Sequence, residues 1–526
     1  MDLEPRDHDK FRLRGWILTT VFVLMLTACG DGHSSSPRDT TPPSIAIDTP
    51  TTAATYLTAS TPITLGGTAS DNVSVASVEW SNAATGDMGT ASGTSSWTAS
   101  LDLAVGPNPI TVTALDAAGN TGTDALTVML CPGALQAWGR NQFGQLGDGT
   151  MLDSLFPVDV VSISSVMDLS AGNSFTLALL CDGTVWSWGS NASGQLGDGT
   201  TQDRPTPVQV VDPTGPSGFL EDVAAIAAGS SHSLALMADG SVRAWGDNQS
   251  GQLGDGTTID SALPVPVVDP LDPSGLLQGV TAIAGGEMHS VVLLSGNTVR
   301  TWGSNAAGQL GDGTMMDSLI PVQVSDPGDP TGYLENVTAV SAGGAHTVAI
   351  IVNATVRAWG TNGSGELGDN GASGINSPIP VVVFDPTDIS GWLTNVDAIA
   401  SSPGAAHTIA LIGGGTVMAW GLNAEGQLGD GTTATRLAAV PVLDTGDPTG
   451  FLTGVSSLTA GAQHNAGLKG DGTFWTWGWN SFGQLGDGTT TNKTTPNRVQ
   501  DPSDPTGFLQ GVMRFAAGAY HSITLK

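Results

Sequence analysis

The fold is decided by the stretch Trp245-Gly246-Asp247-Asn248-Gln249-Ser250-Gly251-Gln252-Leu253-Gly254-Asp255-Gly256, close variants of which recur along most of the chain. The copies begin at Trp138, Trp188, Trp245, Trp302, Trp359, Trp420 and Trp477, at intervals of 50, 57, 57, 57, 61 and 57 residues. Repeats of this length are typical of propellers and solenoids. Each repeat contains about four strand-like stretches, which predicts one four-stranded propeller blade per repeat.

The two ends of the repeat array indicate how it closes. The first repeat opens at Gly133–Trp138 without the His-containing strand that the others have, and the chain stops at Ala517–Leu525, which contains that strand. We therefore expect the C-terminal strands to pair with the first strand of the array. Closure of this kind removes exposed sheet edges. The sequence predicts a seven-bladed β-propeller over residues 131–526.

The amino-acid composition indicates the fold class and excludes one class of partner. The chain has 526 residues, of which 72 are Gly and only 12% are charged, and its hydrophobic content is 40%. Many glycines and short Val, Ile, Leu and Thr runs predict an all-β protein with tight turns. The 48 acidic and 16 basic residues give a net charge of −32. A chain this acidic does not bind nucleic acid by neutralising phosphates.

Residues 43–130 form a separate module. Short alternating strands are predicted at Ser44–Ile47, Ile63–Leu65, Val75–Trp80, Pro109–Ala114 and Ala125–Val128. This spacing is typical of an immunoglobulin-like sandwich. The stretches Ala69–Val75, Gly106–Asn108 and Ala114–Gly122 make the module resemble bacterial Ig-like domains, which act as spacers or adhesive units.

Three acidic residues of this module offer a calcium hypothesis. Asp71, Asp116 and Asp124 carry the oxygen ligands that Ca²⁺ prefers. Local hydrogen bonds from Asp side chains to turn backbone are the alternative, and we favour it.

The N-terminus has the pattern of an export signal. Arg12 and Arg14 precede an apolar run of about eleven residues, Trp16–Leu26, which is the length of a signal-peptide core and shorter than a membrane span. Leu26-Thr27-Ala28-Cys29 resembles the lipobox of bacterial lipoproteins. The resemblance implies a signal peptide at 1–28, a lipidated Cys29, a flexible linker at 29–42, and a place in the bacterial outer membrane or on the cell surface. An ordinary secretory signal with a chance cysteine is the alternative.

Two cysteines remain after Cys29. Cys131 and Cys181 each lie seven residues before a repeat tryptophan, so they occupy equivalent positions in neighbouring repeats. Equivalent positions in adjacent blades are expected to lie too far apart for a disulfide. The sequence therefore predicts two separate thiols.

The repeated motif resembles the regulator of chromosome condensation family, whose repeats form seven-bladed propellers. Eukaryotic members exchange guanine nucleotide on a small GTPase and dock on chromatin. No exchange residue is carried over, because the matched motifs belong to the fold. A secreted bacterial member that inhibits β-lactamases through its blade loops is the nearer analogue for an exported chain.

Most of the repeated polar residues are expected to be structural. We expect the tryptophans to pack between blades and the glutamine amides to satisfy loop backbone. Six histidines recur at His232, His289, His346, His407, His464 and His521, and Phe175 takes the seventh place. Blade symmetry spreads these rings around the axis, so we predict no metal site from them. The acid pairs Asp148/Asp153, Asp198/Asp203, Asp255/Asp260 and Asp312/Asp317 are interpreted as solvated loop acids.

Two less regular sets are candidates for partner binding. Arg243, Arg300 and Arg357 each stand two residues before a blade tryptophan. They either pack between blades with the head paired to an Asp, or form a cationic strip for an acidic partner. Six repeats also carry a Pro/Asp/Gly-rich insertion. An aromatic or Leu residue follows its Gly, at Phe219, Leu276, Tyr333, Trp392, Phe451 and Phe508, and either tucks onto the blade, which we favour, or is an exposed anchor.

The function that the sequence favours is binding. We expect a lipid-anchored cell-envelope protein that contacts the membrane through Cys29 and holds a protein or glycan on one propeller face. A carbohydrate-active enzyme is the first alternative, although the sequence shows no catalytic residues, no metal-ligand spacing and no cofactor motif. A nucleotide exchange factor is the second alternative, and it requires the export signal to be illusory.

Overall fold

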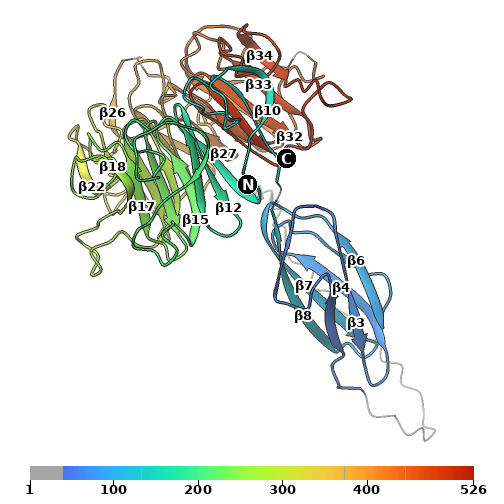
Figure 1. Cartoon of the computed structure of the whole chain (residues 1–526). Coiled ribbons are helices and arrows are strands. Elements are labelled where there is room, and N and C mark those ends of the chain that lie inside the picture. Colours follow the sequence, from blue (N-terminus) through green and yellow to red (C-terminus); the bar gives the residue numbers. More distant parts are fainter. Residues whose placement is uncertain (1–38, 132, 372–373, 445) are drawn as a thin grey trace, which may run out of the picture.

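The chain folds into a two-sheet sandwich followed by a ring of four-stranded sheets (Figure 1). The structure is a computed structural model that describes residues 39–526, except 132, 372–373 and 445. Every regular element in this part of the chain is a β-strand, which confirms the all-β prediction. The segment predicted to be a signal peptide, residues 1–28, and Cys29 lie outside the described residues. Within those residues no helix is long and apolar enough to cross a membrane.

The sandwich contains the strands predicted in its part of the sequence, each somewhat longer. One sheet has the order β1 (Ser44–Thr49), β3 (Ile63–Ser70) and β6 (Ser96–Leu101). The other has the order β2 (Thr55–Thr58), β8 (Thr121–Leu130), β7 (Gly106–Asp116), β4 (Val75–Asn82) and β5 (Met88–Thr90). Alternate residues of both sheets face one core, in which Leu65, Trp97 and Val112 are fully buried or nearly so. The period-2 pattern thus buries one face of each sheet.

The chain enters and leaves the sandwich at opposite ends. Asp39 contacts Asn120 beside the end of β7, because the Asn120 side chain donates to the Asp39 carbonyl. Leu130, where β8 ends, pairs with Gly106, where β7 begins. The eleven residues of β7 span roughly 35 Å at the usual rise per residue. The sandwich therefore separates its entry point from the ring by about that length.

The ring is built from seven four-stranded antiparallel sheets within the described residues. The innermost strands are β11 (Val166–Ala171), β15 (Val223–Ala228), β19 (Val280–Gly285), β23 (Val337–Ala342), β27 (Val396–Ala400), β31 (Val455–Ala460) and β35 (Arg514–Ala517). The second strands are β12 (Phe175–Leu180), β16 (His232–Met237), β20 (His289–Leu294), β24 (His346–Ile351), β28 (His407–Ile412), β32 (His464–Lys469) and β36 (His521–Leu525).

The outer half of each sheet carries the tryptophan motif and the strand that follows it. The third strands are β13 (Val185–Gly189), β17 (Val242–Gly246), β21 (Val299–Gly303), β25 (Val356–Gly360), β29 (Thr416–Gly421), β33 (Phe474–Gly478) and β9 (Leu135–Gly139). The outermost strands are β14 (Arg204–Gln209), β18 (Ser261–Pro266), β22 (Ser318–Gln323), β26 (Ser377–Val382), β30 (Arg436–Pro441), β34 (Lys493–Arg498) and β10 (Ser154–Asp159).

Strands from both ends of the chain close the ring. The last sheet has the order β10-β9-β36-β35, and β36 pairs with β9 from His521 opposite Gly139 to Leu525 opposite Leu135. This confirms that the C-terminal strands pair with the first strand of the array. Each innermost strand contacts the innermost strand of the next sheet, and β35 contacts both β31 and β11. The ring is therefore continuous.

The repeated motif folds the loop after each third strand. In the loop after β17, the Asn248 side-chain oxygen accepts the Leu253 N–H at 3.0 Å and its amide nitrogen donates to Asp255 at 3.1 Å. The Gln252 side-chain oxygen accepts the Ser250 N–H at 2.9 Å. These bonds satisfy backbone groups in a tight turn, so the glutamine prediction is confirmed.

The same motif joins neighbouring sheets. The Trp302 indole is fully buried and donates to the Gln252 carbonyl of the preceding sheet at 2.9 Å. Gly254 has a φ of 67°, and a Cβ there would lie 2.7 Å from the Trp302 indole nitrogen. A side chain at this glycine would strain the backbone and strike the ring. The tryptophans therefore pack between sheets, as predicted.

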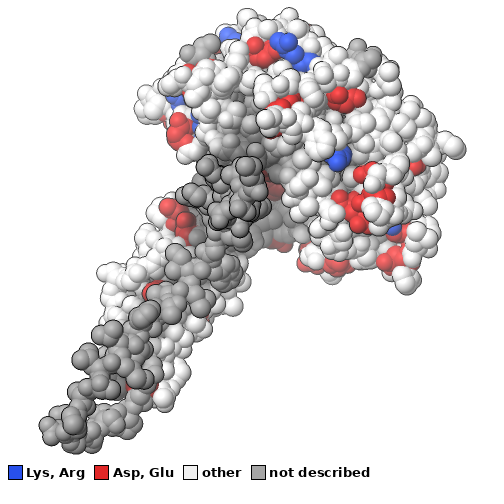
Figure 2. Space-filling view, turned by 180° about the vertical axis from the view of Figure 1, so that it is seen from behind, with Lys and Arg blue, Asp and Glu red and all other residues white. Residues whose placement is uncertain are grey.

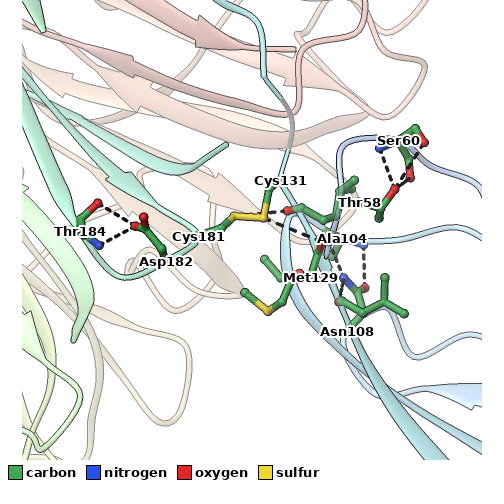
Figure 3. The surroundings of a disulfide bond; sticks show 12 residues. Thr58, Ser60, Ala104, Asn108, Met129, Cys131, Cys181, Asp182 and Thr184 are labelled. Atoms are coloured by element: carbon green, nitrogen blue, oxygen red, sulfur yellow. Dashed lines mark hydrogen bonds between the residues drawn. A yellow bond between two sulfur atoms is a disulfide. The ribbon is translucent and has the colours of Figure 1, made fainter. Parts of the chain in front are cut away.

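The prediction of two separate thiols is wrong. Cys131 and Cys181 form a disulfide with a Cα–Cα distance of 6.1 Å (Figure 3). The prediction assumed that Cys131 and Cys181 occupy equivalent positions in adjacent blades, and Cys181 lies in the β12–β13 turn of its sheet. However, Cys131 directly follows β8 and its N–H donates to Thr58 of the sandwich. Because the chain reaches β9 from the sandwich instead of from a hairpin partner, Cys131 lies beside the neighbouring sheet. The disulfide therefore ties the sandwich exit to the ring.

Candidate functional site

The two ends of the ring sheets define two faces. The sandwich-side face carries the turns between second and third strands and the connections from each outermost strand to the next sheet. The distal face carries the connections from first to second strands and the motif loops after the third strands. The sandwich is attached to the sandwich-side face. The chain leaves the sandwich and enters β9 at the end of that strand that lies on this face, and Cys181 lies in the β12–β13 turn of the same face. Figure 1 shows the sandwich extending away from the ring on one side.

The three predicted arginines lie near the sandwich-side face and are half-buried. They occupy the second residues of β17, β21 and β25, in three consecutive sheets. Among the described residues no carboxylate lies within 4.0 Å of Arg243, Arg300 or Arg357. The Arg300 Nε and the Arg357 Nη1 are buried without a hydrogen-bond partner. The interpretation that each arginine guanidinium forms an ion pair with an Asp is therefore wrong.

Arg243 still influences nearby acids. Partial burial acts to raise the pKa of Asp212, but the bonds from Thr214 and the charge of Arg243 outweigh burial and hold that pKa below its usual value. Asp212 begins the insertion that carries Phe219. The structure therefore brings Arg243 close to the base of an insertion loop.

Two other sheets place a lysine against the equivalent acid. Lys469 lies 3.2 Å from Asp444, and Lys526 lies 3.4 Å from Asp501. Both aspartates begin insertions, and both lysines belong to the following sheet. A cation against the base of the insertion is thus a recurring feature of this face.

The insertion loops present their large side chains to solvent. The exposed fractions are 38% for Phe219, 43% for Tyr333, 50% for Trp392 and 39% for Phe451. The backbone of each residue bridges to the start of its own loop, as Phe219 does to Val211. The prediction of tucking is therefore correct for the backbone but wrong for these four side chains. Phe508 differs, because the Arg498 guanidinium lies 4.1 Å from its ring centre.

The ring axis holds a shallow pocket of about 260 Å³ lined by residues from all seven innermost segments. The side chains that line it are apolar apart from hydroxyl groups, which belong to Ser170, Ser341, Ser401, Ser402 and Thr459. An enzyme that used this axis would need titratable groups there. The lining contains none.

The recurring histidines link the sheets. Each is fully buried, and its Nε2 lies 2.9–3.0 Å from a hydroxyl or amide oxygen of the next sheet, as His289 does from Thr347. Burial lowers the pKa of His232, His407 and His521 to about 4 and, with added repulsion from neighbouring histidines, that of His289, His346 and His464 to about 3. The histidines are neutral intersheet contacts, and no three of them converge as metal ligands in the described residues.

The paired acids hold the motif loops together. Asp148 accepts bonds from Asn141 and Thr150, while Asp153 accepts the Asn141 N–H at 2.7 Å. Where the second acid is replaced by Asn492, that side chain accepts the equivalent N–H of Asn480 at 2.9 Å. These acids are therefore bound to the loops and not simply solvated.

The three sandwich acids named in the calcium hypothesis do not lie together. Asp124 accepts the Ile47 N–H, away from the other two. Asp71 and Asp116 lie with Asp39, with one carboxylate oxygen of each within 4.8 Å of the others. Asp71 caps the N–H groups of Val73 and Ser74. Asp116 likewise accepts the N–H groups of Ala118 and Asn120, so both turn acids make the local backbone bonds that the sequence favoured. The other carboxylate oxygen of Asp71 is buried without a hydrogen-bond partner.

Surface charge follows the composition. Figure 2 shows clusters of Asp and Glu separated by uncharged surface, with only isolated Lys and Arg groups on the visible side of the ring. The whole chain carries a net charge of −32. An unpaired cation on this surface is therefore an unusual local feature.

The sequence analysis did not predict one cluster of aromatic and arginine side chains. Arg140, Phe143, Trp479, Phe482 and Tyr520 lie together on the distal face, where the ends of the ring meet. The available signal was an aromatic residue at loop positions where most repeats have a small or polar residue. We name this group the seam cluster.

Comparison with known sequences identifies the family. The profile of the RCC1-like domain matches residues 168–524, and that of the regulator of chromosome condensation repeat matches residues 132–179. The chain belongs to the RCC1-like family. The resemblance carried by the repeated tryptophan motif is thereby confirmed.

Two named proteins share about 30% identity with the chain. The Ultraviolet-B receptor UVR8 of Arabidopsis thaliana is 30% identical over 52% of this chain and 57% of its own length. The E3 ubiquitin-protein ligase HERC2 of Homo sapiens is 29% identical over 58% of this chain and 6% of its own length. The chain thus spans little more than half of the plant receptor and a small part of the ligase.

Two solved structures share the fold of the ring. Human WBSCR16 superposes with a TM-score of 0.62 at 23% identity, covering 75% of this chain and 98% of that protein. Yeast RCC1 (Prp20), solved bound to Kap60, gives a TM-score of 0.60 at 20% identity, with 75% and 89% covered. The shared part corresponds in extent to the ring.

Proposed function

We propose that this RCC1-like protein is a lipid-anchored protein of the bacterial cell envelope whose seven-bladed propeller binds a protein partner on its sandwich-side face. The observation that carries the proposal is the set of half-exposed aromatic side chains on the insertion loops of that face. Exposed aromatics of this kind are enriched where proteins bind one another. The RCC1-like membership supports a protein-binding role, while a glycan is the alternative ligand.

The arginines add specificity to the proposed surface. Arg243, Arg300 and Arg357 lie in consecutive sheets near the same face, and Arg243 lies close to the base of the loop that carries Phe219. The three make no ion pair within the described part of the chain. Guanidinium groups bind carboxylates in bidentate geometry. A partner with acidic groups facing these loops would fit, and the aromatics would supply its apolar contact area.

The Ig-like sandwich acts in this proposal as a spacer. The entry and exit of its chain lie at opposite ends, about one long strand apart, and the Cys131–Cys181 disulfide fixes the exit to the ring. Lipidation of Cys29 would place the entry end at the membrane. Disulfides persist in oxidising compartments outside the cytosol, which supports export.

The anchor and the binding surface have separate tests. We expect wild-type chain, but not the Cys29→Ser variant, to incorporate labelled palmitate and to sediment with membranes. A photo-crosslinking amino acid at position 392 should form a covalent adduct with a protein in intact cells. The same group at position 259, on the distal face, is the control. Absence of lipid label would refute the anchor, and adducts at 259 but not at 392 would refute the choice of face.

A further inference from the structure

The seam cluster combines side chains from three segments that are far apart in sequence. Arg140 and Phe143 follow β9, Trp479 and Phe482 follow β33, and Tyr520 directly precedes β36. The Arg140 N–H donates to the Tyr520 carbonyl at 2.9 Å. The cluster is therefore fixed to the β36–β9 pairing that closes the ring, on the face opposite the sandwich.

Three aromatic rings of the seam cluster contact one another edge to face. The ring centres of Trp479 and Phe482 are 5.5 Å apart, those of Trp479 and Tyr520 are 5.7 Å apart, and those of Phe482 and Tyr520 are 5.9 Å apart. The interplanar angles of 68–82° belong to the favoured geometry of aromatic pairs. Each ring is half-buried, so part of its surface faces solvent.

Arg140 lies over this group. Its guanidinium carbon is 4.8 Å from the centre of Phe482, 5.1 Å from that of Tyr520 and 6.0 Å from that of Phe143. These distances fall within the range of cation–π attraction. The guanidinium donates to the Gln142 side chain. No carboxylate lies within 4.0 Å of it among the described residues.

The fold does not need these aromatic rings. At the Trp479 position the other sheets have Arg140, Ser190, Asp247, Ser304, Thr361 and Leu422. At the Phe482 position they have Phe143, Ser193, Ser250, Ala307, Ser364 and Glu425. At the Tyr520 position they have Ser174, Ser231, Met288, Ala345, Ala406 and Gln463. Because the same loops form around serine elsewhere in the ring, large rings at the seam serve something other than loop geometry.

The composition of the seam cluster defines the chemistry of its ligand. Trp, Tyr and Arg are the residue types that dominate binding energy at protein interfaces. A guanidinium that stacks on rings and lacks a counter-ion is preorganised for a carboxylate. A neutral glycan would leave this charge unused, and a second copy of a chain carrying −32 would be repelled.

We propose that the seam cluster is a second binding site, which takes a protein segment presenting a carboxylate beside an apolar side chain. The carboxylate pairs with Arg140 and the apolar side chain packs on Trp479, Phe482 and Tyr520. This site is independent of the surface proposed above, since it lies on the opposite face of the ring. An RCC1-like ring with both sites would join two partners through its two faces.

The test uses the full chain and a displayed library of random 12-residue peptides. Peptides selected on wild type are measured by titration against Trp479→Ser, Tyr520→Ser and Arg140→Met, which install residues found at equivalent loops or remove only the charge. Ile259→Ser is the matched control, because Ile259 is 72% exposed on the distal face of another sheet. Thermal unfolding of each variant shows that the ring is intact.

We expect the selected peptides to share an Asp or Glu next to a Leu, Ile, Phe or Trp. Affinity should fall about 30-fold in Trp479→Ser and Tyr520→Ser, the loss usual for hot-spot residues, and should not change in Ile259→Ser. Arg140→Met should remove the preference for the acidic residue. Peptides without a carboxylate, equal affinity for the seam variants, or self-association that the seam variants abolish would each overturn the proposal.

Discussion

The imidazole Nε2 of His289 lies 3.0 Å from the hydroxyl oxygen of Thr347 in the next sheet. That hydroxyl in turn donates to the Gln309 carbonyl at 2.9 Å. Since the hydroxyl hydrogen is used in the second bond, the His289 Nε2 carries the proton in the first. The Nδ1 is then unprotonated, and it is buried without a partner. The histidine is therefore held in its neutral form.

This arrangement predicts a steep loss of stability in mild acid. The unfolded chain binds protons at its histidines below pH 6.5, whereas burial lowers the folded pKa values of six of them to about 3 or 4. The free energy of unfolding is therefore constant above pH 6.5 and falls as pH drops toward 4. Each histidine contributes a slope of about 1.4 kcal/mol per pH unit. Urea unfolding at pH 7.5, 6 and 5 measures the sum.

Two variants separate protonation from packing in that experiment. His289→Phe copies Phe175, which is fully buried at the same place in another sheet, and should make the slope shallower by about 1.4 kcal/mol per pH unit. Thr347→Val keeps the histidine but removes its hydrogen-bond partner, so it should lower stability at every pH by about 1–3 kcal/mol with the slope unchanged. Equal slopes in wild type and His289→Phe would contradict the prediction.

Gly286, three residues before His289, should be intolerant of a side chain. A Cβ at Gly286 would lie 2.1 Å from the His289 Cε1. Gly286→Ala is expected to cost at least 1–3 kcal/mol, the usual penalty of overpacking, in urea unfolding. Gly296→Ala is the control, because a Cβ there meets nothing within 4 Å. In Gly286→Ala/His289→Ala the two losses should not add, and strict additivity would count against the steric explanation.

The sequence predicted the ring because its contacts are local and repeated. Trp302, Gln252 and Gly254 meet across one sheet boundary, and the same motif recurs in each sheet. One solution therefore satisfies every copy, and it can be inferred from any of them. The predicted strands of the sandwich were located for a similar reason, since alternation buries one face of each strand.

The disulfide and the seam cluster depend on tertiary placement that no local pattern encodes. Cys131 shares its repeat position with Cys181, but the chain reaches it from the sandwich, which changes its direction. Arg140 and Tyr520 meet only because the chain ends pair. The exposure of the insertion aromatics such as Trp392 likewise depends on how far a loop stands from the sheet, which composition does not determine.

A buried acid in the motif offers a stabilising substitution. Glu366 replaces the usual glutamine, its carboxylate accepts the Ser364 N–H at 2.7 Å, and burial raises its pKa. Glu366→Gln keeps the acceptor and removes a buried charge, so stability at pH 7 should rise by about 0.5–2 kcal/mol. The unpartnered amide nitrogen seen at Gln252 limits the gain.

The gain from Glu366→Gln should depend on pH in a defined direction. A carboxyl group with a raised folded pKa costs stability when it is ionised, and this cost disappears as pH falls through the folded pKa. The difference between wild type and variant should therefore shrink on acidification. Glu287→Gln, at an exposed loop position of another sheet, serves as the comparison. A gain that grows at low pH would refute the explanation.

The disulfide between Cys131 and Cys181 should fix the sandwich relative to the ring. It closes a loop with a sequence separation of 50, so its removal in Cys181→Ser is expected to lower the stability of the ring by up to about 4 kcal/mol. Met513 also packs against the sandwich core and Val105 against the ring core, but apolar contacts of this kind do not fix an orientation as a covalent bond does. Small-angle scattering of Cys181→Ser should then show a wider range of overall dimensions than wild type.

Reduction of the wild-type chain provides the matched control for this prediction. A reductant should reproduce both the scattering change and faster proteolysis near residue 133, while the sandwich keeps its own transition because its core is separate. In the Cys181→Ser background the same reductant should have no further effect. Two results would show that this bond does not hold the two parts. One is that Cys131 and Cys181 both react as free thiols in denatured chain that has not been reduced. The other is identical scattering in all samples.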